Sequence, residues 1–305
     1  KVPALKLFLG SSTGNMLVDD ENILREIFEN TDLLIAVHSE DEKIINNNLN
    51  QYKLKYGDEI PFHCHPKIRS EEACLKSTLK IIELAKETGA RLHVFHLSTK
   101  SESLLFGNKT TLNKKKITAE VCVHHLWFSD EDYKKKQSLI KWNPAVKTKD
   151  DREALWEALN NDRIDVIATD HAPHTIEEKS KKYIDCPSGG PLVQHGLVSM
   201  IQHYLNKKIS LEKIVTKMCH NPADLFQIEK RGYIKKGYFA DLVLLDLNSP
   251  WKVEKNNILY KCKWSPFEDV VFDSKVTQTF VNGNLVYDNG KFKNELHGIR
   301  LTFER

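Results

Sequence analysis

The sequence of 305 residues has no apolar run that approaches the roughly 18 residues of a membrane span. Its first residues, KVPALKLFLGSS, lack the long apolar core and the small-residue cleavage pattern of a signal peptide. No internal repeat is found, and no low-complexity segment beyond the Lys runs at 114–116 and 134–136. These absences predict a globular chain without membrane association, long enough for one barrel-sized domain or two smaller ones.

An excess of charge of either sign is also missing. Lys and Arg number 45 against 42 Asp and Glu, a net charge of +3, and the basic residues are interspersed among acids. A chain without a basic block is not expected to bind nucleic acid or a membrane surface.

The six cysteines include no C-x-x-C pair. This spacing excludes zinc-ribbon and thioredoxin-like motifs, and a chain of this length does not need disulfides to fold. We expect reduced thiols in a cytoplasmic protein.

Short β-rich apolar runs alternate with helical patterns in the first half of the chain, which predicts a parallel sheet with helical crossovers. The expected strands are 4–9, 33–38, 91–97, 118–126, 139–144 and 165–170. The expected helices include 19–30, capped by Asp19 or Asp20, 70–89, capped by Ser70 and ended by Gly89, and 148–162.

After Asp170 the pattern changes to a long loop, two helical segments at 196–206 and 210–226, and then a β-rich tail from Gly232. An Asn-Gly turn is expected at Asn282 and Gly283. We predict a barrel catalytic domain over 1–231 and the C-terminal part of a small β domain over 232–305.

Polar side chains lie within or at the ends of four expected strands: Lys6, His38, His96 and Asp170. In a β/α barrel the carboxyl ends of the strands converge on one mouth. Two imidazoles and a carboxylate there suit zinc. A single histidine at the end of a strand is more often an ordinary hydrogen-bonded residue of the surface or core than a metal ligand. An aspartate at the end of a strand is often the N-cap of the helix that follows. Their conjunction on separate strands favours a metal site.

The other histidines have plainer interpretations. His63 and His65 form an H-x-H that follows a charged segment, so we expect a surface loop. His124 and His125 are expected to end a strand with their side chains on opposite faces, in structural roles. His171 is expected to pack the loop or support the metal ligands.

Several motifs resemble the amidohydrolase superfamily, and more narrowly the dihydroorotases of the multifunctional-enzyme-like class. They are TDHAPH followed by EEK, VFHLST, AVHSE, and AEVCVHHL followed by KWNPAVK. The resemblance extends over essentially the whole chain and implies a (β/α)8 metal-dependent hydrolase barrel with a small β-sandwich-like C-terminal unit. An H-x-H expected on the first barrel strand is not found, so we expect this chain to lack the first two strands.

The resemblance also implies roles for individual residues. His38 and His96 match ligands of one metal, and Asp170 matches the carboxylate that binds the other metal and carries the proton. Lys6 matches a lysine that is carboxylated and bridges two zinc ions. A lysine ammonium cannot ligate zinc, so the bridge requires the carbamate. Lys6 as a plain cation, with an acidic residue as the bridge, is left open.

For the substrate, the resemblance implies contacts from Asn143, His174, Ser188 and Gly189. A side-chain amide can pair with both the donor and the acceptor of a cyclic amide. The LVQH after the glycine-bearing loop CPSGGP departs from the family pattern.

The implied activity is zinc-dependent, reversible hydrolysis of dihydroorotate to N-carbamoyl aspartate in pyrimidine biosynthesis. Two alternatives stay open: a hydantoinase or allantoinase, which His174 and the following EEK disfavour, and an inactive dihydroorotase-like scaffold. Either a homo-oligomer or association with other pyrimidine-pathway enzymes is compatible with the sequence.

Overall fold

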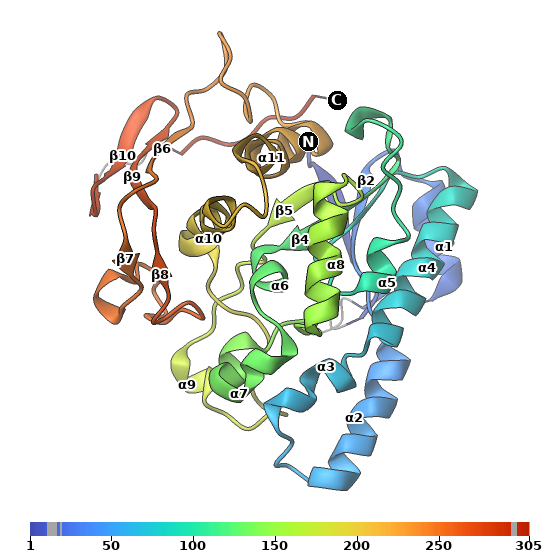
Figure 1. Cartoon of the computed structure of the whole chain (residues 1–305). Helices are drawn as coiled ribbons and strands as arrows, with labels where there is room; N and C mark the ends of the chain where they lie inside the picture. The colour runs from blue at the N-terminus through green and yellow to red at the C-terminus, as the bar shows by residue number, and fades with distance from the viewer. Residues whose placement is uncertain (11–16, 19, 294–297, 305) are drawn as a thin grey trace. The chain divides into compact units, whose positions relative to one another are not determined.

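The computed structural model describes residues 1–10, 17–18, 20–293 and 298–304. The N-terminal half of the chain contains a five-stranded, wholly parallel sheet in the order β1-β2-β3-β4-β5 (Figure 1). The strands are β1 (Ala4–Phe8), β2 (Leu34–His38), β3 (Leu92–Val94), β4 (Ile117–Cys122) and β5 (Val166–Ala168). Five of the six expected strands are confirmed, and sequence order equals spatial order, as successive strand–helix units require.

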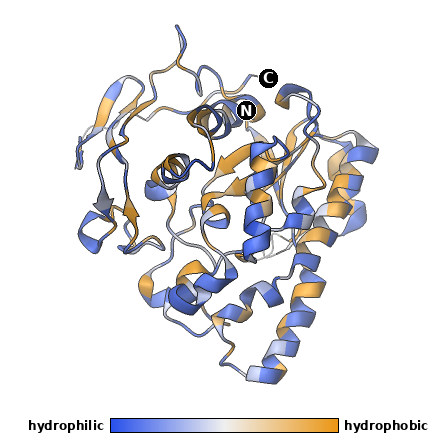
Figure 2. Ribbon diagram, in the orientation of Figure 1, coloured by the Kyte–Doolittle hydropathy of each residue, from blue (hydrophilic) through white to orange (hydrophobic). Residues whose placement is uncertain are grey.

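Helices connect the strands. They are α1 (Glu21–Glu29), α2 (Glu42–Tyr56), α3 (His65–Ile68), α4 (Glu71–Thr88), α5 (Lys100–Ser103), α6 (Val123–Trp127), α7 (Tyr133–Lys136) and α8 (Lys149–Asn160). Helices α1, α4, α5 and α8 are successive neighbours along one side of the sheet (Figure 1). The strands of the sheet and parts of these helices are hydrophobic (Figure 2).

The predicted helix ends are confirmed where the structure describes them. Asp20 caps α1 by accepting from two backbone N–H groups, whereas the alternative cap, Asp19, lies outside the described residues. Ser70 caps α4, and Gly89 ends it in the left-handed conformation at φ +72°. That conformation is accessible to Gly without a Cβ penalty.

The expected strand at 139–144 is wrong. Residues Gln137–Ile140 form a 3-10 helix, η4, and the peptide between Asn143 and Pro144 is cis. Ile140 and Trp142 are fully buried, which explains the apolar pattern. The backbone carbonyl groups of this segment pair with other loops instead of a neighbouring strand, since Trp142 O bonds His65 Nε2 at 2.7 Å and Lys141 O accepts from Gly189 N at 2.9 Å.

The expected strand at 118–126 is too long. It ends at Cys122, and α6 begins at Val123. Residues 118–126 are buried throughout, so no change in hydrophobic periodicity marks the switch from strand to helix. His124 and His125 therefore lie on a helix and are both buried, contrary to the prediction that they end a strand.

The chain divides into two compact units, residues 4–194 with 259–266, and residues 1–3 with 195–258 and 267–305. The second unit contains most of α10 (Val193–Leu205), then α11 (Leu211–Val215), a π-helix, η5 (Thr216–His220), and α12 (Asn221–Leu225). The predicted boundary between 231 and 232 stays a prediction.

The β-rich tail forms an antiparallel sheet in the order β11-β10-β9-β6. Its strands are β6 (Leu242–Asp246), β9 (Lys275–Val281), β10 (Asn284–Asp288) and β11 (Lys291–Phe292), and β7 (Trp251–Lys252) pairs separately with β8 (Val271–Phe272). Asn282 and Gly283 form the expected turn between β9 and β10, with φ angles of +51° and +83°. Both positive values are typical of a type I′ hairpin turn.

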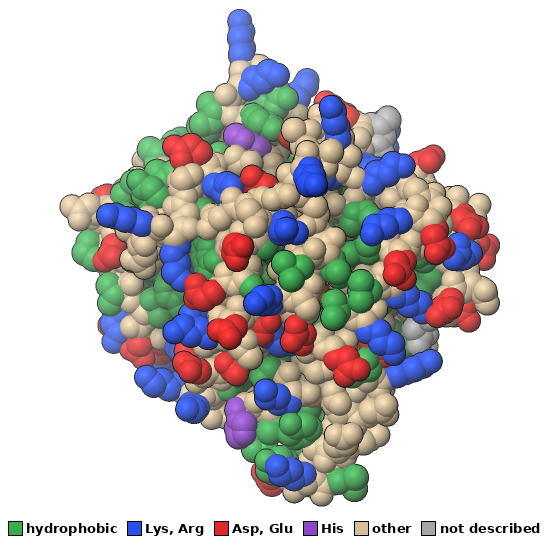
Figure 3. Space-filling view, turned by 45° about the vertical axis from the view of Figure 1, so that its right-hand side comes forward, with side chains coloured by type: hydrophobic (Ala, Val, Ile, Leu, Met, Phe, Trp, Pro, Cys, Tyr) green, Lys and Arg blue, Asp and Glu red, His purple; other side chains and the backbone are tan. Residues whose placement is uncertain are grey.

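The surface agrees with the composition. Basic and acidic side chains are interspersed on the face shown in Figure 3, without a block of one sign. All six cysteines, which lie in the described part of the chain, are free thiols, as predicted. Within the described ranges, no helix is both long and apolar enough to cross a membrane.

Candidate active site

Two histidines meet at the carboxyl ends of adjacent parallel strands. His38 is the last residue of β2, and His96 follows β3 by two residues with φ +39°. Both are buried, and His38 Nδ1 lies 3.0 Å from His96 Nε2. Two nitrogens bound to one tetrahedral zinc ion at its usual bond length are about 3.3 Å apart. Burial also lowers the pKa of His96, which favours the neutral form that ligates metal. The pair fits a shared metal ion.

A buried ion pair supports His38. Glu40 is fully buried, and its Oε2 lies 2.8 Å from His38 Nε2. Arg69 donates to both Glu40 oxygens at 2.7–3.1 Å. Burial alone would raise the pKa of Glu40, but the charge of Arg69 and the hydrogen bond from His38 hold that pKa well below its usual range. The carboxylate therefore accepts from His38 Nε2–H, which leaves the Nδ1 lone pair facing His96.

Lys6 lies in the middle of β1. The residue as a whole is exposed, but its Nζ is covered by two rings: it lies 4.0 Å from the centre of the Phe95 ring and 4.7 Å from that of Phe8. Desolvation lowers the pKa of Lys6, and the negative charges of Asp170 and Glu120 oppose the shift. A lowered pKa increases the fraction of neutral amine, the form that can react with carbon dioxide.

Asp170 follows β5 by two residues in the left-handed region, at φ +46°. Desolvation of the carboxyl group by the atoms packed near it, followed by the charge of Glu120, raises the pKa of Asp170, while the charges of His38 and Lys6 act in the opposite direction. The charges of His38 and Lys6 thus act on Asp170, as expected if the carboxyl ends of their strands converge. A carboxylate of raised pKa is better suited to accept and return a proton near neutral pH.

The full predicted ligand set is not assembled as a cluster. Among the described residues, no group of three or more His, Cys, Asp or Glu side chains has a metal-binding arrangement. His38 and His96 are in contact, and the charges of His38 and Lys6 act on the pKa of the Asp170 carboxyl group. The bridging role of Lys6 and the metal contact of Asp170 stay predictions.

The predicted substrate residues come from three segments that meet. His174 precedes α9 (Ile176–Lys179), and its Nε2 lies 3.2 Å from the carbonyl oxygen of Ser188. Gly189 N donates to the carbonyl of Lys141, two residues before Asn143. Gly189 has φ +125°, and a Cβ there would lie 2.4 Å from Ala172 O, so the loop requires glycine at this position.

A pocket of about 370 Å³ opens beside these residues, lined in part by His171, His174 and Glu178. This volume is within the usual range for small-molecule sites. His171 accepts from Leu192 N at 3.0 Å through Nδ1, which confirms its predicted loop-packing role.

The surface-loop prediction is wrong for one residue of the H-x-H. His63 is exposed in the 3-10 helix η1 (Phe62–Cys64), but His65 begins α3 and is buried. His65 Nδ1 lies 2.7 Å from Tyr183 Oη, and its Nε2 lies 2.7 Å from Trp142 O. The charged residues before the motif predicted that it is exposed. His65 is instead covered by Tyr183 and Trp142, which are distant in the sequence.

The His124–His125 pair supports the same segment. His125 Nε2 lies 3.1 Å from Pro144 O, and the His124 ring stacks on Trp142 with centroids 4.3 Å apart. Burial lowers the pKa of His125 to about 3, so it stays neutral. Both histidines hold the backbone around Asn143.

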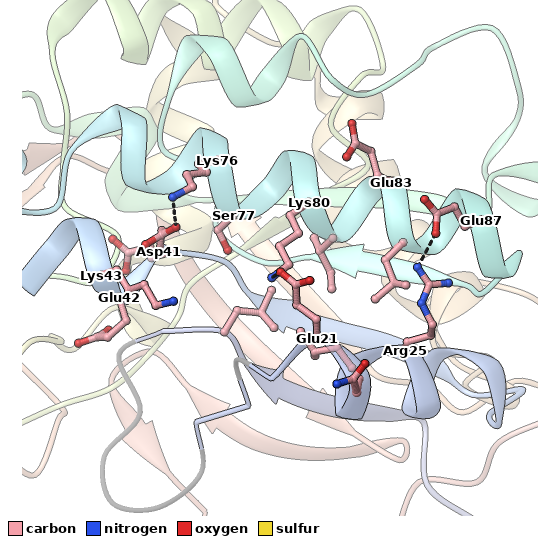
Figure 4. A pocket seen from close by; sticks show the side chains of 16 residues that line it. Glu21, Arg25, Asp41, Glu42, Lys43, Lys76, Ser77, Lys80, Glu83 and Glu87 are labelled. Atoms are coloured by element: carbon pink, nitrogen blue, oxygen red, sulfur yellow. Dashed lines mark hydrogen bonds and ion pairs between the residues drawn. The ribbon is translucent and has the colours of Figure 1, made fainter.

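A second pocket, of about 480 Å³, lies between α1 and α4 (Figure 4). Its labelled charged groups include ion pairs from Lys76 to Asp41 and from Arg25 to Glu87. None of the predicted site residues lines it. These pairs do not supply a converging set of acid and base groups, so this pocket is not the candidate active site.

Sequence reasoning missed Glu40, Arg69 and Lys179. Glu40 had a signal, because an acid two residues after a strand-end histidine can lie on the same side of the chain. Arg69 had none, since 29 residues separate it from Glu40. Lys179 belongs to the EEK motif, but its burial could not be read from a charged tripeptide.

Known proteins are similar to this chain in sequence. Residues 20–286 match the amidohydrolase family profile. A protein named dihydroorotase from Halobacterium salinarum is 31% identical over 288 residues, covering 93% of this chain and 64% of the relative. One of the same name from Pyrococcus furiosus is 30% identical over 298 residues, covering 97% and 64%. The chain thus spans less than two thirds of the length of these relatives.

Solved structures show the same fold. An L-hydantoinase (dihydropyrimidinase) from Arthrobacter aurescens superimposes with a TM-score of 0.87 at 27% identity, over 95% of this chain and 66% of that one. A dihydropyrimidinase from Brevibacillus agri gives 0.85 at 23% identity, over 95% and 64%, which bears on the fold alone. The α/β fold with a parallel sheet therefore matches the amidohydrolase barrel over about two thirds of the hydantoinase chains. From its strand-end histidine pair, its parallel sheet and a family match over most of its length, we conclude that the chain belongs to the amidohydrolase family.

Proposed function

We propose that the protein containing this chain is a zinc-dependent dihydroorotase, which hydrolyses the cyclic amide of dihydroorotate reversibly to N-carbamoyl aspartate. The observation that carries the proposal is the distance of 3.0 Å between His38 Nδ1 and His96 Nε2, together with the hydrogen bond between His38 Nε2 and Glu40. Relatives named dihydroorotase, about 30% identical over nearly the whole chain, support the choice of substrate.

The proposed metal site uses His38 and His96 as ligands of one zinc ion, Asp170 as a ligand of a second, and carboxylated Lys6 as the bridge. Zinc, when bound, supplies Lewis-acid polarisation of a carbonyl and a water acidic enough to lose its proton near neutral pH. The lowered pKa of Lys6 supports carboxylation, because only the neutral amine can attack carbon dioxide.

Asp170 is proposed to accept the proton of the attacking water and to return it to the ring nitrogen that leaves. Its raised pKa supports this general base and then general acid role. Asn143 is proposed to pair with the ring amide, and His174 to bind the carboxylate of dihydroorotate. Ser188 and Gly189 would contribute backbone groups of the loop.

A hydantoinase is the second candidate, because the Arthrobacter aurescens L-hydantoinase structure matches the chain with a TM-score of 0.87. The two candidates differ in whether the substrate ring carries a carboxylate. His174, held at the loop by Ser188 O, is the residue that would recognise this group.

Steady-state kinetics of the full-length protein on dihydroorotate and on an uncarboxylated dihydropyrimidine test the proposal, with metal content measured by elemental analysis. We expect about two zinc equivalents and a kcat/KM that favours dihydroorotate. His174→Ala should reduce that preference, and Lys6→Ala should lower both metal content and activity. Preference for the uncarboxylated ring would favour the hydantoinase, and no turnover of either ring by zinc-loaded protein would favour an inactive scaffold.

A further inference from the structure

Lys179 ends the EEK motif and is fully buried, although both of its neighbours in the motif are acidic. It is the last residue of α9, a single turn capped by Thr175. Glu178 completes the cap by accepting from Thr175 N, and its Oε2 lies 3.7 Å from His174 Nδ1. The turn therefore directs Lys179 inward while Glu178 stays beside His174.

The ammonium of Lys179 is surrounded by backbone carbonyl groups. It donates to Pro187 O and Gly189 O, each at 2.9 Å, and to Lys141 O at 3.4 Å. These three acceptors match the three N–H groups of an ammonium. Within the described residues, no carboxylate lies at ion-pair distance from Lys179. With its donors occupied, this group is suited to holding backbone rather than to reacting with substrate.

Lys141 repeats the arrangement in the same loop. It is buried, and its Nζ donates to Tyr183 O at 2.7 Å and to Cys186 O at 2.5 Å. Burial lowers the pKa of Lys141 and of Lys179 to about 8, so each is mostly protonated at neutral pH. Two cations thus bind four carbonyl groups of the 183–189 loop without a paired carboxylate among the described residues.

The contacts of Lys179 join the segments that carry the proposed substrate residues. Ser188 lies between its two closest acceptors, and His174 Nε2 lies 3.2 Å from Ser188 O. Its third acceptor, Lys141, lies two residues before Asn143 and also accepts from Gly189 N. Loss of the Lys179 ammonium would leave buried carbonyl groups in both segments unpaired, a state that proteins avoid by moving the backbone.

We propose that Lys179 is a positioning residue that sets the conformation of the 183–189 loop and thereby the place of Ser188 O, which holds the His174 ring proposed to bind the substrate carboxylate. This inference rests on the proposed function for the identity of the substrate. The positioning role itself rests only on the contacts between Lys179 and the loop.

The test compares Lys179→Met, which keeps the length of the side chain and removes the donors, with Lys181→Met. Lys181 is exposed two residues away and serves as the matched control. In the full-length protein we expect Lys179→Met to raise KM for dihydroorotate at least about tenfold, with kcat changed less. It should raise KM for an uncarboxylated dihydropyrimidine by a smaller factor. Lys181→Met should leave both constants within about twofold of the parent.

Hydrogen–deuterium exchange of the loop gives a readout that needs no substrate. Lys179→Met should speed exchange at the Gly189 amide, and Lys181→Met should not. If the parent protein does not hydrolyse dihydroorotate, the proposed function fails while faster exchange still supports the positioning role. Unchanged exchange together with unchanged KM in a folded Lys179→Met protein overturns the inference. Should that variant not fold, Lys141→Met is read by the same two measurements and the same criteria.

Discussion

Replacing Arg69 with Met should lower the free energy of unfolding by about 3–5 kcal/mol at pH 7, because Glu40 would lose its buried cationic partner. Glu40 has no solvent exposure, and Arg69 supplies its contacts at 2.7, 3.1 and 3.1 Å. Water cannot replace these donors without opening the site. Of the other neighbours of Glu40, His38 offers a single N–H and Cys74 a weak Sγ contact at 4.0 Å, and the charge of Lys147 acts more weakly than that of Arg69.

An exposed ion pair provides the matched control. Arg25 and Glu87 lie 2.6 Å apart, but their side chains are 50% and 57% exposed (Figure 4). Arg25→Met should cost less than about 1 kcal/mol, as exposed pairs generally do. The double change Glu40→Gln with Arg69→Met should recover part of the loss, because a neutral amide needs no counter-charge.

Urea denaturation, with and without a metal chelator, measures both effects. The difference between parent and Arg69→Met should be largest above about pH 4.5 and shrink in acid. The direction of this pH dependence follows from the pKa of Glu40, which is lower in the folded than in the unfolded protein. The ionised Glu40 therefore stabilises the fold above its unfolded pKa, and this contribution is lost as the pH falls. Zinc content should also fall, since Glu40 would no longer be fixed by Arg69 in the position from which it orients His38. A loss no larger than that of Arg25→Met, with zinc retained, would refute the reasoning.

Three further predictions follow from individual residues. Burial raises the pKa of Glu102 to about 6, so the folded state binds more protons and stability should fall by about 2 kcal/mol in total as the pH rises from below 4.5 to above 6. Glu102→Gln should abolish this slope in melting curves, and an unchanged slope contradicts the assignment. Asp170→Asn should lower kcat by roughly 10²–10⁴ with a much smaller change in KM, measured in steady state, because an amide cannot accept the proton. Gly189→Ala should destabilise the fold by about 2–4 kcal/mol in urea denaturation, since its Cβ would lie 2.4 Å from Ala172 O, whereas Gly107→Ala, with open space around it, should not.

Local signals in the sequence determine much of this molecule. Ser70 and Gly89 set the ends of α4 through a side-chain cap and a left-handed residue, and Asn282 with Gly283 sets a hairpin. Each acts within a few residues, so it is legible without the fold. The approach of His38 to His96 could also be predicted, because adjacent parallel strands bring their carboxyl ends to one edge.

Long-range packing decides the rest. The segment at 139–144 is apolar enough for a strand, but His65 and Gly189 pair with its backbone, and neither contact is encoded in those six residues. Arg69 reaches Glu40, and Lys179 reaches the 183–189 loop, only after α4 and α9 have packed. A charged side chain is buried only where the fold supplies matching partners, and those partners lie 8 to 38 residues away in the sequence. Hydrophobic periodicity cannot report such pairs, because it records which face of an element is apolar and not which polar groups meet across it.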